Sequence, residues 1–123
     1  MIVQDSCDCV LLLLRGPTAP RGALQWNLPG GFVRPREDVA RAARREAREE
    51  ANLCVGTLAP FARTRSAGGI LHVFCATSWS GRVRLLDGEH VAHVWVPRKE
   101  APSWDVVGVQ RSILRAYAAT DLR

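Results

Sequence analysis

The stretch GFVRPREDVARAARREAREEANL, residues 31–53, decides how this 123-residue chain folds. From Asp38 to Ala51 it is rich in Ala, Arg and Glu and contains neither Gly nor Pro, so it predicts a helix. Small apolar residues recur there every four positions and give the helix a narrow packing face: Val39, Ala43, Ala47 and Ala51. Upstream, Pro29-Gly30-Gly31 and Pro35 predict tight breaks, so a loop leads into the helix.

Three glutamates crowd one side of this predicted helix. Glu46 lies three positions before Glu49 and four before Glu50, and residues at these spacings are neighbours on a helix surface. Their mutual repulsion can be relieved in two ways. The surrounding arginines can pair with them on a solvated face, or a hard divalent cation such as Mg²⁺ can bind the carboxylate oxygens. The nine residues REAREEANL, 45–53, leave both interpretations open.

The residues upstream of the helix favour the metal-binding interpretation. Six charged or glycine residues stand at fixed distances from one another: Gly31, Glu37, Arg45, Glu46, Glu49 and Glu50. With the apolar Ala47 and Leu53, the stretch resembles the Nudix box, G-x5-E-x7-R-E-U-x-E-E-x-G-U, where U is apolar. The flanking segments WNLPGG, 26–31, and EHVAHVWV, 89–96, are also similar to that family, so the resemblance spans nearly the whole chain.

Two positions depart from the family pattern. Asn52 replaces the last glycine of the box, where the chain commonly turns with a left-handed residue after the helix. Asparagine tolerates that conformation best after glycine, so the exchange is expected to cost the fold little and removes no metal ligand. Arg36 stands where many members have glycine before the first box glutamate.

The rest of the chain reads mainly as strands, which turn-prone residues separate. Strands are expected at 2–3, 9–14, 55–64, 70–78 and 91–96, with a hairpin turn at 66–69 and a further strand between Gly81 and Asp87-Gly88. A terminal helix is expected from a Ser103 cap, with Asp105 in its first turn. Its apolar stripe comprises Val106, Val109, Ile113 and Tyr117. These elements predict an α+β domain over 1–123, and the resemblance implies the Nudix fold: an α/β/α sandwich with a mixed sheet, a central box helix and a C-terminal helix.

The resemblance implies Mg²⁺-dependent hydrolysis, with Mn²⁺ as a substitute, of a nucleoside diphosphate linked to another group. Carried over by position, Glu49 and Glu50 are the main metal ligands, Glu46 is a ligand or the base that activates water, and the Gly30 carbonyl supplies a further oxygen. Glu37 and Arg45, with Gly31, orient the loop and the glutamates, and Arg45 is weighed against a direct catalytic role. Outside the box, Glu89 is a candidate ligand or general base, or else an exposed turn residue.

The choice of substrate is less well defined by the sequence. Candidate contacts to base and phosphate are Arg15, Trp26, Arg34 and Phe74, although each also suits packing or the surface. His90 and His93 can likewise be substrate contacts or structural residues. The compact length favours a nucleoside triphosphate or deoxynucleoside triphosphate pyrophosphohydrolase that releases the monophosphate. The alternatives are nucleotide sugars, dinucleoside polyphosphates, RNA 5′ ends, or a non-catalytic nucleotide-binding module.

Composition limits the cellular setting. No apolar run approaches the roughly 20 residues of a membrane helix, and the N-terminus lacks a signal-peptide pattern, so we expect a cytoplasmic protein without a membrane partner. The spacing of the four cysteines fits reduced, partly buried thiols. The net charge of +5 favours anionic partners, although nothing points to RNA in particular. The short first strand makes a homodimer compatible with the sequence.

Overall fold

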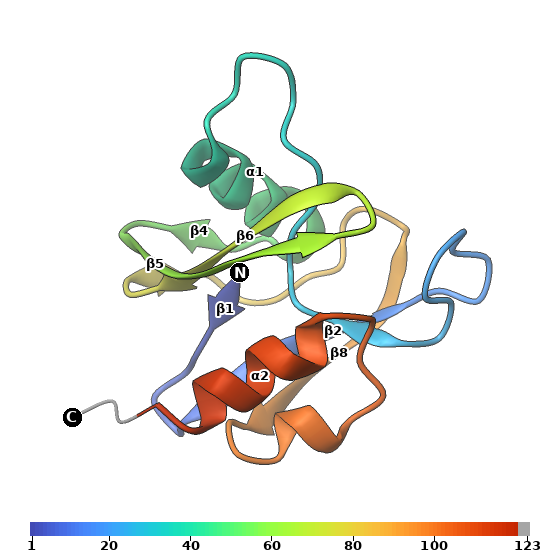
Figure 1. Cartoon of the computed structure of the whole chain (residues 1–123), viewed down its shortest axis with the longest axis vertical. Helices are drawn as coiled ribbons and strands as arrows, with labels where there is room; N and C mark the ends of the chain where they lie inside the picture. The colour runs from blue at the N-terminus through green and yellow to red at the C-terminus, as the bar shows by residue number, and fades with distance from the viewer. Residues whose placement is uncertain (121–123) are drawn as a thin grey trace.

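The computed structural model describes residues 1–120 and confirms the α+β class (Figure 1). The helices are α1 (Val39–Ala51) and α2 (Gln110–Ala118), and a 3-10 turn, η1, covers Ala101–Ser103. The strands are β1 (Ile2–Val3), β2 (Cys9–Arg15), β3 (Trp26–Asn27), β4 (Cys54–Val55), β5 (Leu58–Ser66), β6 (Gly69–Ala76), β7 (Trp79–Ser80) and β8 (His90–Pro97).

The strands form a mixed arrangement of three small sheets. In the first, β1 pairs parallel with β6, and β6 pairs antiparallel with β5 through the hairpin turn expected at 66–69. In the second, β2 lies between β3 and β8 and is antiparallel to both. The short β4 and β7 form the third.

The centre of the fold is β2, which is covered on both sides. Four consecutive apolar residues of this strand are fully buried: Val10, Leu11, Leu12 and Leu13. Such an unbroken apolar run is typical of a strand that is covered on both faces. Val10 and Leu12 belong to the cluster that contains the buried face of α2, whereas Leu11 and Leu13 belong to the cluster that contains Ala47 and Ala51 of α1. Successive side chains of a strand point to opposite faces, so this division places the strand between the helices.

Helix α1 lies where the sequence predicts it. The Asp38 side chain caps its N-terminus by accepting a hydrogen bond from the Arg41 N–H at 2.8 Å. Asn52 ends it in the left-handed conformation, at φ 63° and ψ 30°. The Leu53 N–H then bonds to the Ala47 carbonyl at 3.2 Å, which closes the last turn. The structure therefore confirms that asparagine performs the terminating role of the box glycine.

The prediction that the last helix begins at Ser103 is wrong. Ser103 ends η1, and α2 begins only at Gln110. Residues 105–107 are extended because they pair with the edge of β3: the Trp26 N–H bonds to the Asp105 carbonyl at 2.8 Å, and the Val107 N–H bonds to the Trp26 carbonyl at 3.0 Å. Ile113 and Tyr117 are buried on α2 as predicted.

Two smaller expectations also need correction. Residues 82–86 do not form a strand, because the Arg84 N–H bonds to the Ala51 carbonyl and the Asn52 side-chain amide bonds to the Arg82 carbonyl at the end of α1. All four cysteines are free, as expected, but Cys7 and Cys54 are exposed rather than partly buried. Within residues 1–120, no helix has both the length and the apolar character needed to cross a membrane.

Candidate functional site

The loop before α1 is tied to the helix by one arginine. Arg45 binds Glu37 through two parallel hydrogen bonds, Nε to Oε2 and Nη2 to Oε1, both 2.9 Å long. Its Nη2 also donates to the Phe32 carbonyl at 3.0 Å, and Glu37 accepts the Arg34 N–H at 3.0 Å. Hydrogen bonding to Arg45 lowers the pKa of Glu37 to about 2. A bidentate arginine–carboxylate pair defines direction as well as distance, so it fixes the loop relative to the helix.

The same arginine holds two of the three helix glutamates. Its Nη1 lies 2.7 Å from Glu46 Oε1 and 3.2 Å from Glu49 Oε2, and Arg34 lies 3.5 Å from the other oxygen of Glu49. Glu46 also lies against Gly31, where an added Cβ would come within 2.5 Å of its carboxylate. A larger residue at position 31 would therefore displace the Glu46 carboxylate from this place.

Glu50 is held differently from the other two glutamates. It is only 5% exposed, and its Oε1 accepts a hydrogen bond from the Gly30 N–H at 2.7 Å. Its Oε2 faces His90 Nδ1 at 3.8 Å, and none of the arginines or the lysine in the described residues pairs with it. Burial raises the pKa of Glu50 to about 8, although the Gly30 N–H opposes the shift.

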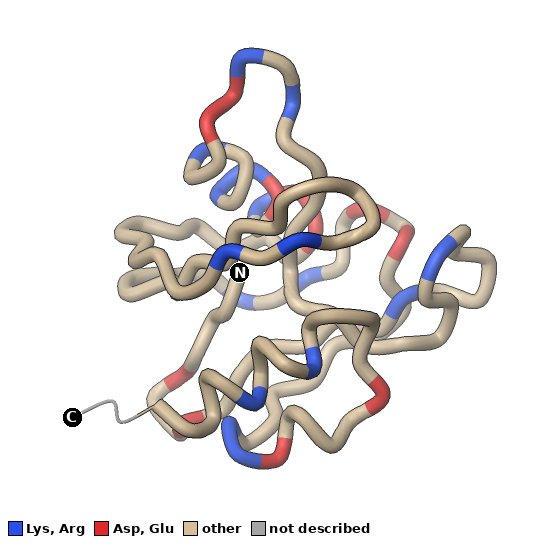
Figure 2. Tube along the Cα trace, viewed as in Figure 1, with Lys and Arg blue, Asp and Glu red and all other residues tan. Residues whose placement is uncertain are grey.

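Glu50 forms a cluster with Asp87, in the turn before β8, and with His90, the first residue of β8. One ligand-type atom each from Glu50, Asp87 and His90 lies within 4.8 Å of the others. Figure 2 shows the acidic residues of α1 close to those of the turn before β8. Over residues 1–120 the box glutamates alone do not form such a group, because Arg45 draws Glu46 and Glu49 away from Glu50.

These residues fit a hard divalent cation. The carboxylates provide oxygen donors, and the buried Glu50 carboxylate has no ion pair with an arginine or lysine of the described residues, so a metal ion would supply positive charge there. The Gly30 carbonyl belongs to the same loop residue whose N–H holds Glu50. The sequence indicates Asp87 only as part of an Asp-Gly turn, whereas the structure brings it into this group. Its position three residues before a histidine was the available signal.

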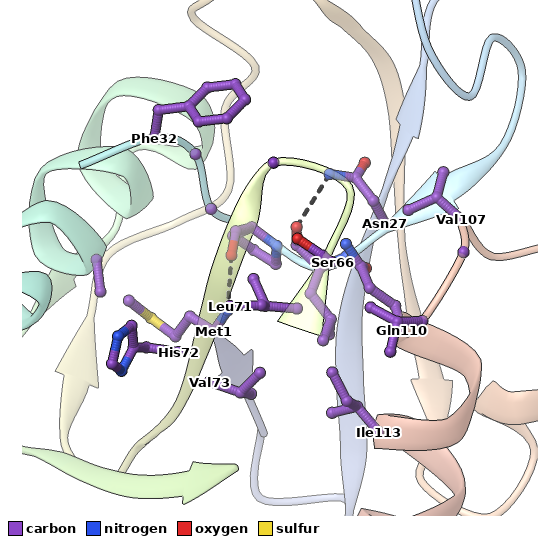
Figure 3. Close-up of a pocket in the computed structure, with 18 of the residues that line it drawn as sticks. Met1, Asn27, Phe32, Ser66, Leu71, His72, Val73, Val107, Gln110 and Ile113 are labelled. Carbon is purple, nitrogen blue, oxygen red and sulfur yellow. Dashed lines mark hydrogen bonds between the residues drawn. The ribbon is translucent and has the colours of Figure 1, made fainter. Parts of the chain in front are cut away.

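A cavity of about 720 Å³ opens beside the glutamates, a size typical of small-molecule sites (Figure 3). Its wall runs from the glycine loop across β6 to the start of α2, and it shares Gly30 and Gly31 with the glutamate site. Of the predicted substrate contacts, Arg15 and Phe74 line it. The exposed Phe32 stands at its edge, close to the turn of the β5–β6 hairpin.

Other predicted residues lie elsewhere. Trp26 packs edge-to-face on Trp104, with ring centroids 5.2 Å apart, and Arg34 reaches Glu49 rather than the cavity. The Glu89 side chain is exposed, while its backbone N–H bonds to Asp87 and its carbonyl accepts the Gly16 N–H. His93 lines a separate hollow with Trp79 and Trp95.

Comparison with known proteins identifies relatives for this arrangement. The NUDIX domain family model matches residues 1–117. The mouse 8-oxo-dGDP phosphatase NUDT18 is 32% identical over 100 residues, which are 78% of this chain and 30% of the mouse protein. The human protein of the same name is 31% identical over the same shares. The chain thus spans less than a third of the length of these curated relatives.

Solved structures are similar over nearly the whole chain. The solution structure of the E. coli ORF135 protein has a TM-score of 0.74 at 28% identity, covering 96% of this chain and 84% of that one. The crystal structure of a MutT Nudix hydrolase from Burkholderia pseudomallei has a TM-score of 0.76 at 25% identity, covering 97% and 98%.

Proposed function

Because the chain belongs to the Nudix family, we propose that it is a Mg²⁺-dependent pyrophosphohydrolase that cleaves nucleoside or deoxynucleoside triphosphates and releases the monophosphate. As a Nudix hydrolase it acts on phosphoric anhydride bonds of nucleotide derivatives. The observation that carries the proposal is the buried Glu50 carboxylate, which shares Gly30 with a cavity large enough for a nucleoside.

Glu50, Glu49 and Glu46 are the proposed metal ligands, together with the Gly30 carbonyl. Bound Mg²⁺, or Mn²⁺ in its place, neutralises phosphate charge, orients the phosphates and lowers the pKa of bound water. Arg45 and Glu37 hold the loop and the glutamates in register, which keeps the ligand oxygens directed toward the substrate phosphates. Glu89 is the proposed alternative to Glu46 as general base, because hydrogen bonds anchor its backbone on both sides and the residue is exposed to solvent.

The cavity is the proposed site for the nucleoside. Its lining is largely aliphatic, with Phe74 in the wall and Arg15 and Arg21 at one end. Gln110 supplies a directed polar group, because its Oε1 accepts the Leu28 N–H at 2.7 Å. The amide then presents its N–H donors to a ligand, and donors select bases that carry carbonyl oxygens, such as guanine and its 8-oxo form.

The relatives extend the list of substrates to be tested. NUDT18 is named as an 8-oxo-dGDP phosphatase, so oxidised guanine diphosphates are included beside triphosphates. The four free thiols, two of them exposed, suit the reducing cytoplasm, where we place the enzyme.

A hydrolysis screen with product masses tests this function. The substrates are the canonical and 8-oxo nucleoside di- and triphosphates, nucleotide sugars, dinucleoside polyphosphates and capped RNA, each with Mg²⁺ and with EDTA. We expect Mg²⁺-dependent release of a nucleoside monophosphate, fastest with guanine nucleotides. Tight nucleotide binding that is indifferent to Mg²⁺, without release of any phosphate product, would instead identify a non-catalytic binding module.

A further inference from the structure

His90 is the first residue of β8, and its side chain is buried. A β-bulge next to it sets the direction of this side chain. Leu14 of β2 lies opposite Ala92, but the next residue, Arg15, lies opposite His90, so Val91 is the extra residue of β8. A shift by one residue exchanges the two faces of a strand. Val91 is accordingly 53% exposed, while the His90 side chain is 1% exposed.

Both ring nitrogens of His90 meet oxygen acceptors. Asn27 donates its Nδ2 to the Leu28 carbonyl at 3.0 Å, which leaves its Oδ1 facing His90 Nε2 at 3.1 Å. On the other side, Nδ1 lies 2.9 Å from Asp87 Oδ2 and 3.8 Å from Glu50 Oε2. The ring therefore lies between Asn27 of β3, which lines the cavity, and Glu50 of the glutamate site.

The partners of His90 are themselves anchored. Asp87 Oδ1 accepts the backbone N–H groups of Glu89 and His90, at 3.0 and 3.3 Å, so its second oxygen is fixed toward the ring. Glu50 is fixed on its far side by the Gly30 N–H. With both ends held, the imidazole limits where the second Glu50 oxygen can lie.

We propose that His90 is a positioning residue: its Nδ1 edge, which Asp87 fixes, holds the Glu50 carboxylate in place for a divalent cation without binding the cation itself. The inference rests on the proposed function, because it takes Glu50 as a metal ligand. Mg²⁺ and Mn²⁺ prefer oxygen donors, and residues that orient metal ligands typically alter metal affinity by about 10- to 100-fold when they are replaced.

Two substitutions distinguish the role of Nδ1 from the role of Nε2. His90→Asn keeps a donor near the Nδ1 position, whereas His90→Gln keeps one near Nε2. His90→Leu removes both, and His93→Asn is the matched control on the same strand. Binding of Mn²⁺ is measured by the electron paramagnetic resonance signal of the free ion, with circular dichroism to establish that each variant is folded.

We expect His90→Leu and His90→Gln to weaken Mn²⁺ binding about 10- to 100-fold. His90→Asn should stay within about threefold of wild type, and His93→Asn should not differ from it. Equal affinities for His90→Asn and His90→Gln would overturn the proposal, and this comparison remains decisive if His90→Leu does not fold. An imidazole ¹⁴N coupling on bound Mn²⁺ that disappears in His90→Asn would also overturn it, by making His90 a ligand.

These outcomes are separate from the test of the hydrolase. A wild-type protein that binds Mn²⁺ but cleaves no nucleotide contradicts the proposed function and leaves the comparison of His90 variants intact. A protein that cleaves nucleotides normally after His90→Leu, with unchanged Mn²⁺ affinity, contradicts the positioning role alone.

Discussion

Replacing Glu50 by glutamine should stabilise the metal-free protein while abolishing turnover. Burial raises the pKa of Glu50 to about 8 from an ordinary value of 4.5. Because the folded state then holds its proton more tightly than the unfolded state, the stability from this group is complete below pH 4.5 and is lost as the pH rises toward 8. At pH 7 the loss amounts to about 3 kcal/mol, at roughly 1.4 kcal/mol per pH unit above 4.5.

Glutamine keeps the shape of the protonated side chain and its acceptor for the Gly30 N–H, but it carries no charge to desolvate. In EDTA at pH 7 we therefore expect Glu50→Gln to melt roughly 10 °C above wild type, and the difference to vanish near pH 4.5. Added Mg²⁺ should raise the melting temperature of the wild type but not of the variant. The variant should lose at least about 100-fold in kcat, because it lacks a metal ligand.

Glu49→Gln is the matched control, since Glu49 is exposed and its ion pairs with Arg34 and Arg45 are at the surface. Its unfolding free energy should change by less than about 1 kcal/mol. Thermal unfolding of the three proteins across pH 4.5 to 8 makes the comparison. If Glu50→Gln is no more stable than wild type at pH 8 in EDTA, the argument from burial is wrong.

Five further substitutions, at four positions, test the surroundings of the site. Arg45→Lys keeps the charge but loses the bidentate pair with Glu37, so kcat/KM should fall about 10- to 100-fold in steady-state assays. Arg36 is exposed at φ 65°, and Arg36→Gly should raise the free energy of unfolding in urea by up to about 1 kcal/mol. Asn52→Ala should lower the same quantity by about 1–2 kcal/mol, whereas Asn52→Gly should be nearly neutral; equal effects would contradict the left-handed cap. Gln110→Glu should reduce the kcat/KM ratio of dGTP to dATP by about tenfold or more, and an unchanged ratio would remove Gln110 from base recognition.

The box helix was predictable because its determinants are local. Helix propensity, the Asp38 cap and the tolerance of Asn52 for left-handed backbone all act within one or two turns. The two departures from the family pattern have one explanation. Arg36 and Asn52 both have φ near +64°, the region in which glycine is free of strain, so each replaces a glycine where the backbone requires it.

The parts that were not predictable depend on distant pairing. The segment after Ser103 has a helix cap, an early acidic residue and an apolar spacing typical of a helix, but the bridge between Val106 and Trp26 keeps its first part extended. Asp87 and His90 are only three positions apart in the sequence. The orientation of the His90 ring, however, also depends on Asn27, which lies 63 positions away. The pattern of apolar residues in the sequence does not predict the bulge at Val91. This bulge determines which side chain at the start of β8 faces inward.

The arrangement of the three glutamates also answers the ambiguity of their sequence. The sequence REAREEANL allows either a salt-bridged face or a metal site. In the structure Glu46 and Glu49 form the salt bridges, and Glu50 is the buried glutamate that fits a metal site. Glu46 and Glu49 both form ion pairs with Arg45, and the Glu49 side chain is exposed, whereas Glu50 is buried and pairs with none of the arginines in the described residues. Burial of the Glu50 carboxylate opposes folding when it is ionised, and its hydrogen bond from the Gly30 N–H offsets this cost only in part. The metal ion of the proposed function would supply the positive charge that no arginine brings to Glu50, and Glu49 is the ion-paired glutamate whose carboxylate is exposed.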